Sequence, residues 1–392
     1  MFLAPMEGLG DRRLRRALAR STGGFDEACR EFTRVPGALS QGAKPEKLLR
    51  GVALNGYAAD ELLFLGDETS GETEDMHLLA AQVMGSNPEL LERCARFLAA
   101  EGGAPRVDLN CGCPANVVTG KGAGSSLLRD PADVYESVAA VARGVRGTGC
   151  AVTAKLRSGY DDRGLLRENL LAAQAGGAAF VTLHPRTRRE GYTGHARWED
   201  IAFAVDVLDV PVVGNGDVTS PAKAFELVRE TNCAGVMIGR GAVQDPLVFR
   251  RIKTAFASSG RDDAFDSDLD PNEPAAIKRF LRAFAAEAFA GEALPGARVR
   301  ASKRLSARDL EKFKLGKLKQ VCKYLFAANP GLTPHLAAVL SADENAVTAE
   351  ATLERIERLV EAHWRAPTDV LVDAFSMRAG YERGMRDGGK AV

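Results

Sequence analysis

The segment NCGCP at residues 110–114 holds the side chains of this chain that are best suited to chemistry. It follows a short apolar run and opens into the glycine-rich stretch GKGAG at residues 120–124. Glycine and proline turn the backbone here, which places a thiol at the mouth of a strand, within reach of a substrate. The alternative is a buried cysteine pair, because free cysteine often packs as a small core residue. The context described below favours a reactive thiol.

The cysteines and the apolar segments of the chain indicate the compartment in which the protein works. Seven cysteines are scattered over 392 residues, an odd number that fits a reducing compartment better than a disulfide framework. Cys111 and Cys113 resemble half of a metal clip, but no histidine or other cysteine stands at ligand spacing from them, so no metal is expected. The start MFLAPMEG lacks the features of a signal peptide, and no apolar run has membrane-spanning length. We therefore expect a cytoplasmic protein with no membrane partner, and a monomer by default.

The first 257 residues alternate between short apolar segments and segments of helical periodicity. Strands are predicted at residues 2–6, 26–32, 78–84, 106–111, 152–157, 180–184, 211–215 and 235–239. Helices are predicted at 11–21, 88–100, 131–143, 165–175, 221–229 and 246–257, several beginning with proline after Asn, Asp or Ser. Eight such repeats predict a (β/α)8 TIM barrel, an α/β fold, over residues 1–257. The alternative is a Rossmann-like sheet, but the glycine-rich turn after its first strand is missing.

The rest of the chain predicts a second, smaller unit. Residues 258–274 are acidic and poor in apolar side chains, which is typical of a linker. Helical spacing at 277–289, 308–326, 333–340 and 349–364 predicts a small all-α helical domain over residues 275–366. Residues 367–392 read as a loosely attached tail, and residues 34–73 as an insertion within the barrel.

The net charge of zero hides a strongly basic segment. Residues 298–323 contain ten Lys or Arg against two acids, a net charge of +8, so the remainder carries −8. Binding of a polyphosphate depends on local charge density, so this segment is a candidate surface for nucleic acid. A solvated helix face is an equally good explanation of a basic run considered alone.

Polar residues end most of the predicted strands, and in a barrel these ends form one ring around a shared site. GNGD at 214–217 and IGRGA at 238–242 end strands seven and eight, where glycine backbones and Arg240 suit a phosphate. Lys155 supplies a cation that suits the charge of a reduced flavin ring, and Gln82 a hydrogen-bonding group for the same ring. His184 also stands at a strand exit, although a buried structural histidine is the alternative.

Taken together, these motifs resemble those of the tRNA-dihydrouridine synthase family. LAPMEG, QVMG, DLNCGCP with its GKGAG loop, AKLRSGYDD, TLHPRT, GNGD and IGRGA occur in this order across the whole predicted barrel. LAPMEG and the early EFTRV resemble the branch called DusC, which acts on position 16 of the D loop. The resemblance implies an FMN-bearing barrel with a helical RNA-binding domain. The expected cofactor-binding residues are Pro5, Met6, Glu7, Gln82, Lys155, His184, Asn215, Gly216, Asp217, Gly239 and Arg240.

The resemblance also implies a reaction. NADPH reduces FMN, which delivers hydride to C6 of a uridine extruded from the tRNA, while Cys113 matches the family's donor of a proton to C5. Cys111 occupies a place that is more often apolar, and it receives no role. Expected contacts to tRNA are Asn110, on the uracil, and Lys121, Arg157, Arg186, Arg298, Arg300, Lys317 and Lys319. The alternatives are an FMN oxidoreductase acting on a free pyrimidine or other small molecule, and a non-catalytic RNA-binding protein.

Overall fold

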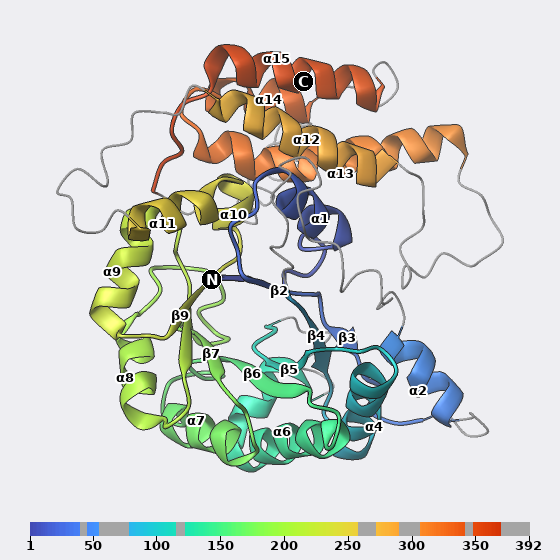
Figure 1. Cartoon of the computed structure of the whole chain (residues 1–392), viewed down its shortest axis with the longest axis vertical. Coiled ribbons are helices and arrows are strands. Elements are labelled where there is room, and N and C mark those ends of the chain that lie inside the picture. The colour runs from blue at the N-terminus through green and yellow to red at the C-terminus, as the bar shows by residue number, and fades with distance from the viewer. Residues whose placement is uncertain are drawn as a thin grey trace, which may run out of the picture.

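The computed structural model describes residues 1–39, 45–54, 78–114, 122–257, 272–289, 306–341 and 348–369 (Figure 1). Eight parallel strands in these ranges close into a barrel, because the first strand pairs with both the second and the last. They are β1 (Phe2–Leu3), β2 (Glu27–Cys29), β4 (Leu78–Met84), β5 (Arg106–Cys111), β6 (Ala151–Arg157), β7 (Val181–His184), β8 (Val212–Asn215) and β9 (Gly235–Ile238). The predicted barrel is confirmed. A short additional strand, β3 (Thr33–Arg34), pairs with the end of β4.

The register of the strands brings the chemistry-bearing residues to one level of the barrel. Asn110 on β5 stands beside Lys155 on β6, and Arg157 stands beside His184 on β7. On the other side of the barrel, Asn215 on β8 is level with Met237 on β9. Because all strands run the same way, these residues share the carboxyl end of the barrel, where the following loops also lie.

Helices surround the barrel, as expected for the repeating pattern. They are α1 (Arg12–Ser21), α2 (Pro45–Leu54), α4 (Pro88–Ala100), α6 (Pro131–Val145), α7 (Leu166–Ala175), α8 (Glu199–Val207), α9 (Pro221–Thr231), α10 (Gly241–Gln244) and α11 (Val248–Ala257), with the 3-10 helix η1 (Gly124–Arg129). Asn87, Asp130 and Ser220 cap α4, α6 and α9 through their side chains, directly before a proline. The helix predicted at 246–257 begins later than expected, because Asp245 accepts a hydrogen bond from the Leu247 N–H in a tight turn.

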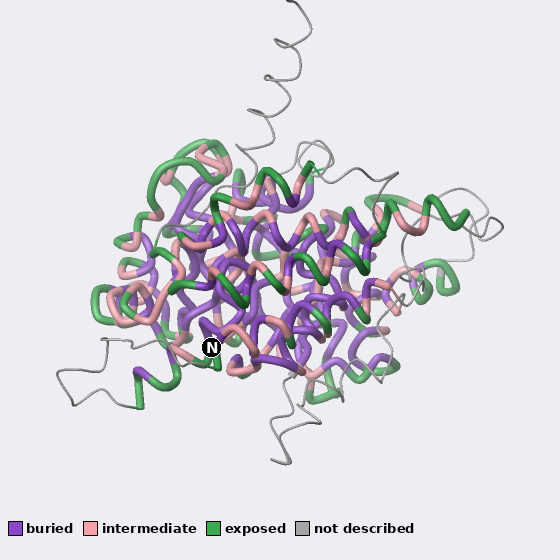
Figure 2. Tube along the Cα trace, turned by 90° about the horizontal axis from the view of Figure 1, so that it is seen from above, coloured by how far each residue is buried: buried purple, intermediate pink, exposed green. Residues whose placement is uncertain are grey.

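A helical region packs against one side of the barrel and shares its hydrophobic core. It comprises α12 (Glu273–Phe289), α13 (Ala307–Ala328), η2 (Thr333–His335), α14 (Leu336–Leu340) and α15 (Ala349–His363). In Figure 1 these orange and red helices lie over α1 and α10 of the barrel; α12 packs on α1, and α13 packs on α10. Figure 2 shows, from above, buried residues running through the middle of the molecule. The contact is therefore an extensive packed interface.

Both ends of the helical region are fastened to the barrel. Glu273, the last but one residue of the predicted linker, begins α12 and pairs with Arg251 of α11 and with the indole N–H of Trp364. At the other end, the Thr219 hydroxyl donates to the carbonyl of Asp369. Residues 258–271 of the linker and 370–392 of the tail lie outside the described residues, as do 40–44 and 55–73 of the insertion. Among the helices of the described ranges, none is long and apolar enough to cross a bilayer.

Candidate functional site

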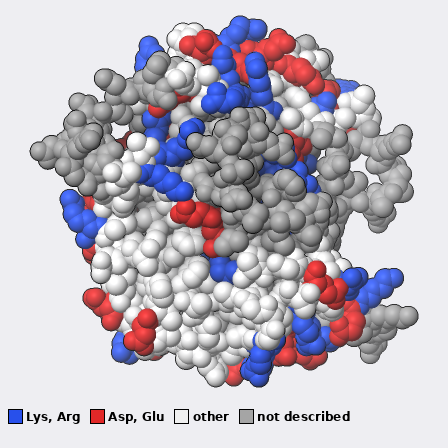
Figure 3. All heavy atoms as spheres, in the orientation of Figure 1, with Lys and Arg blue, Asp and Glu red and all other residues white. Residues whose placement is uncertain are grey.

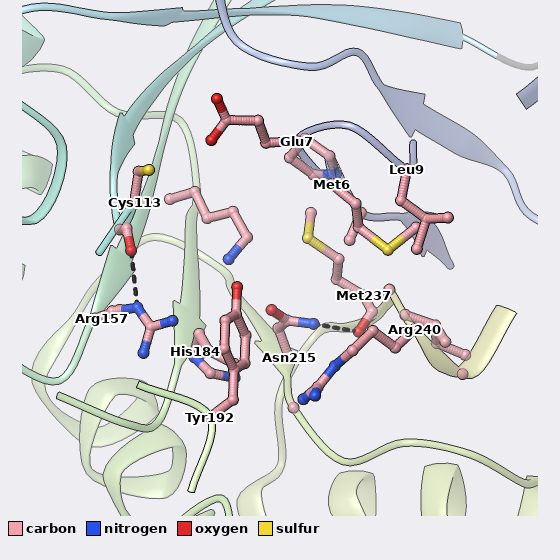
Figure 4. Close-up of a pocket in the computed structure, with 18 of the residues that line it drawn as sticks. Met6, Glu7, Leu9, Cys113, Arg157, His184, Tyr192, Asn215, Met237 and Arg240 are labelled. Carbon is pink, nitrogen blue, oxygen red and sulfur yellow. Dashed lines mark hydrogen bonds between the residues drawn. The ribbon is translucent and has the colours of Figure 1, made fainter. Parts of the chain in front are cut away.

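The carboxyl ends of the strands enclose a cavity of about 480 Å³ (Figure 4). This volume falls within the usual range for small-molecule and cofactor sites, about 300–1,000 Å³. The predicted site residues that line it are Pro5, Met6, Glu7, Asn110, Cys113, Lys155, Arg157, His184, Asn215, Gly216, Asp217, Gly239 and Arg240. Sequence motifs from nearly every strand end therefore meet at one hollow.

The turn after β5 separates its two cysteines. The Asn110 side-chain oxygen accepts hydrogen bonds from the N–H groups of Gly112 and Cys113, at 3.0 and 2.9 Å, which fixes a turn directly after the strand. Cys113 then lines the cavity, whereas Cys111 lies in the hydrophobic core with no exposed surface. Burial raises the pKa of the Cys111 thiol well above its usual range. The two thiols differ in position, and Cys113 is the one that a ligand in the cavity meets.

Arg157 braces this turn from the neighbouring strand. Its guanidinium donates to the carbonyls of Gly112, Thr187 and Gly191, at 2.8, 3.1 and 2.8 Å (Figure 4 shows the first). The residue is only 3% exposed, and burial lowers its pKa. The sequence suggested that Arg157 holds a tRNA phosphate. The structure instead gives its donors to backbone carbonyls of the loops after β5 and β7.

Two basic groups lie in the cavity wall next to Arg157. Burial, with the Arg157 charge as the next cause, lowers the pKa of Lys155 to about 8. Within the described part of the chain, Lys155 has no hydrogen bond or ion pair. Burial and the surrounding cations also hold the pKa of His184 well below its usual range, so its imidazole is neutral at pH 7. The cavity thus contains a partnerless cation and a neutral imidazole.

The glycine-rich ends of β8 and β9 form the opposite part of the cavity. The Asn215 side chain donates to the Met237 carbonyl at 2.8 Å and joins the two strand ends (Figure 4). Gly216 adopts a φ of +122°, which a residue with a side chain rarely adopts, and the Trp198 indole donates to its carbonyl. At Gly241 a Cβ would meet the Val218 carbonyl oxygen at 2.3 Å. Glycine is therefore required where the backbone turns beside Arg240.

Gln82 and Arg186 lie elsewhere than the sequence analysis placed them. Gln82 is fully buried and does not line the cavity; it donates to Asp108 at 2.7 Å and accepts from the Asn110 amide at 3.0 Å. Arg186 is 2% exposed and holds both carboxylate oxygens of Asp217, at 3.0 and 2.7 Å. Gln82 therefore holds the Asn110 side chain, and Arg186 holds Asp217; neither residue lines the cavity.

Breaking the Arg186–Asp217 pair should destabilise the protein. Asp217→Asn keeps the shape and tolerates the positive φ of 58°, but it leaves the buried Arg186 charge without its counter-ion. We expect a loss of about 3 kcal/mol in the free energy of unfolding, measured by urea titration. Asp161→Asn removes an exposed ion pair with Arg189 and should cost less than about 0.5 kcal/mol. Equal effects of the two changes would contradict this assignment.

Several predicted RNA contacts cannot be placed on the cavity. Lys121, Arg298 and Arg300 lie outside the described residues. Lys317 on α13 forms an ion pair with Asp11 at 3.0 Å, and Lys319 on the same helix is half-buried. Figure 3 shows charged side chains of both signs crowded over the helical region, above a barrel face that is mostly uncharged. Lys317 thus attaches α13 to the barrel.

Three aromatic residues of the cavity, Phe32, Tyr192 and Tyr324, were not predicted from the sequence. Tyr192 lines the cavity and lies between Arg157 and Arg240 in Figure 4, with their guanidinium carbons at 5.2 and 4.6 Å from its ring centre. The signal was an aromatic residue between Gly191 and Gly194 in the long loop after β7. Tyr324 comes from α13, far along the chain. Its helical spacing gave no sign that it reaches the barrel.

Of the described residues, no group of three or more His, Cys, Asp or Glu could hold a metal ion.

Known proteins similar to this chain agree with the geometry. The family model described as "Dihydrouridine synthase (Dus)" matches residues 2–283. The tRNA-dihydrouridine(16) synthases of Cupriavidus necator and Ralstonia nicotianae are each 38% identical over 262 residues, covering 67% of this chain and 76% and 75% of theirs. That of Neisseria meningitidis serogroup B is 31% identical over 347 residues, covering 88% of this chain and 92% of its own. Among solved structures, histamine dehydrogenase from Rhizobium sp. 4-9 aligns with a TM-score of 0.45 and 15% identity, covering 72% of this chain and 48% of that chain. Because the family model spans the whole barrel and most of α12, this chain belongs to the dihydrouridine synthase family.

Proposed function

We propose that this enzyme reduces a uridine of the tRNA D loop, at position 16, to 5,6-dihydrouridine with FMN as cofactor and NADPH as reductant. The observation that carries the proposal is one cavity lined by both the Cys113 thiol and the half-buried ammonium of Lys155, which has no hydrogen bond or ion pair among the described residues. A proton donor and a cation at the same hollow suit the transfer of a hydride and a proton to a double bond. The names of the relatives at 38% identity support position 16.

The residues present fit FMN. Glycine backbones at Gly216 and Gly239–Gly241, with Arg240 beside them, suit a phosphate that must approach the main chain closely. A half-buried ammonium such as Lys155, whose pKa is lowered by desolvation, favours an anionic or strongly polar partner, which the pyrimidine edge of a flavin offers. Pro5, Met6 and His184 complete the wall around the space for the ring. When bound and reduced, this cofactor supplies the hydride.

The chain's own residues then hold the substrate and the second hydrogen. Cys113 presents its thiol at the cavity surface, where a double bond in the bound base would accept its proton. Asn110 retains one amide hydrogen for a base carbonyl, because Gln82 takes the other. His184, neutral at pH 7, is not a competing acid. Arg157 holds the Cys113 turn in place through the Gly112 carbonyl.

The substrate has to enter as an extruded nucleotide. A base within the stack of folded RNA cannot reach a cavity lined by strand ends, so the uridine must leave the stack. Exposed basic residues on α13, such as Arg308 and Lys312, suit contacts to the phosphates around it. These contacts would position the tRNA without reading its sequence, which leaves selection of the uridine to the geometry of docking.

The test combines cofactor analysis with mapping of the product. Purified full-length protein should carry a yellow flavin released as FMN, and with NADPH it should form dihydrouridine at position 16 of unmodified tRNA. Modification of free uridine at the same rate would favour the small-molecule oxidoreductase. Colourless protein that still binds tRNA would favour a non-catalytic RNA-binding role. Dihydrouridine at another position would retain the enzyme class and reject position 16.

A further inference from the structure

The helical region contributes a side chain to the cavity across from the thiol. Tyr324 of α13 lines the cavity and is 6% exposed. Its helix packs on α10, which directly follows β9. In the barrel order β9 is four strands away from β5, so the loops after them face each other across the ring. A molecule in the cavity therefore lies between the wall that contains Cys113 and the wall to which Tyr324 belongs.

The same helix also grips the loop after β1. Pro5, Met6, Glu7 and Leu9 of this loop line the cavity. Gly8, between them, has a φ of +76°, and its peptide groups are held from both sides. Its N–H donates to the Glu31 carboxylate of the barrel, and its carbonyl accepts from the Gln320 amide of α13 at 2.8 Å. The position of this cavity wall thus depends on a contact from the helical region.

An ion pair next to this loop fixes how α13 packs against the barrel. Lys317, one turn before Gln320 on α13, contacts Asp11 at 3.0 Å. The other oxygen of Asp11 caps α1 by accepting from the N–H groups of Arg13 and Leu14, at 3.1 and 3.3 Å. The side chains of Lys317, Asp11 and Arg13 are all largely buried. The ion pair is therefore shielded from water, and it holds α13 at one distance from the loop.

We propose that α13 is a structural wall of the flavin site, with Gln320 and Tyr324 as positioning residues. This inference rests on the proposed function. Tyr324 closes the cavity opposite Cys113, and Gln320 keeps the loop of Pro5–Leu9 at the distance that a bound ring requires. The helical region is consequently needed to bind the cofactor even when no RNA is present. A region that served only to dock RNA would leave cofactor affinity unchanged when these contacts are lost.

The experiment measures FMN dissociation from full-length protein by flavin fluorescence, without RNA. Gln320→Met removes the amide donor at similar length and should raise the dissociation constant about 3- to 10-fold, the range of one net hydrogen bond. Tyr324→Ala should raise it by about tenfold or more, because a buried wall is lost. Tyr324→Phe keeps the ring and should stay within about threefold of the wild type.

The control lies on the exposed face of the same helix. Lys312→Ala should weaken tRNA binding and leave FMN affinity unchanged, since its side chain is exposed and does not line the cavity. Thermal unfolding checks that each variant is folded, and Gln320→Met alone decides the question if Tyr324→Ala is not. Wild-type affinity in both Gln320→Met and Tyr324→Ala would overturn the inference. Failure of the wild type to bind FMN would reject the proposed cofactor and the inference with it.

Discussion

Replacing Cys113 with alanine will leave FMN bound and slow dihydrouridine formation by about 10²- to 10⁴-fold, the usual contribution of a positioned general acid. The thiol lines the cavity at the end of a turn that Asn110 and Arg157 fix in place. Alanine removes the proton donor and one atom of side-chain volume without disturbing these backbone contacts. The loss should therefore fall on the step that protonates the base.

Two half-reactions separate this role from a structural one. NADPH should reduce the flavin of Cys113→Ala at the wild-type rate, and single-turnover transfer to tRNA should be slow. Cys111→Ala is the matched control: it removes a thiol from the core two residues away, where no ligand reaches it. That change should cost about 1 kcal/mol of stability and spare the chemistry. Full transfer activity in Cys113→Ala would reject the assignment.

The barrel could be predicted because each of its signals is local. The predicted strand segments of five to seven residues, and proline after a capping Asn, Asp or Ser, each specify an element through short-range sterics and hydrogen bonds. Asn87, Asp130 and Ser220 begin their helices where the sequence indicated. Active sites lie at the carboxyl ends of barrel strands, and this rule alone predicts that Cys113 and Lys155 lie at one site.

The partners of polar side chains were not predictable in the same way. Gln82 and Asn110 both lie near the ends of their strands, and only the register between β4 and β5 puts Gln82 beside Asp108, to which it donates a hydrogen bond. Arg186 and Asp217 come from different strand ends, and each looked like a ligand contact when taken alone. Their mutual ion pair depends on the loop path between them. Polarity at a strand end predicts proximity to the site but does not predict which groups face the cavity.

Lys155 should combine a stability cost with the catalytic use proposed for it, and Lys155→Met separates the two. In the folded protein burial lowers the pKa to about 8, whereas an unfolded lysine titrates near 10.4. The unfolded chain thus binds more protons between these values, so stability rises with pH there, and the cost of burying the charge is complete below pH 8. Methionine has similar length and no charge. At pH 7 the flavin-free variant should be more stable by about 1–3 kcal/mol.

The same substitution should weaken function, because a cation facing developing negative charge stabilises it in a dry site. We expect a fall of about 10²-fold in turnover, typical of the loss of one such group. The stability advantage of Lys155→Met, measured by urea unfolding, should shrink as the pH rises from 8 to 10, since the wild-type lysine then loses its charge. Lys253→Met, which removes an exposed ion pair with Asp26, should show neither effect. A Lys155→Met protein that is less stable than wild type at pH 7 would show that this ammonium already has a partner inside the protein, and the case for an anionic ligand beside it would fail.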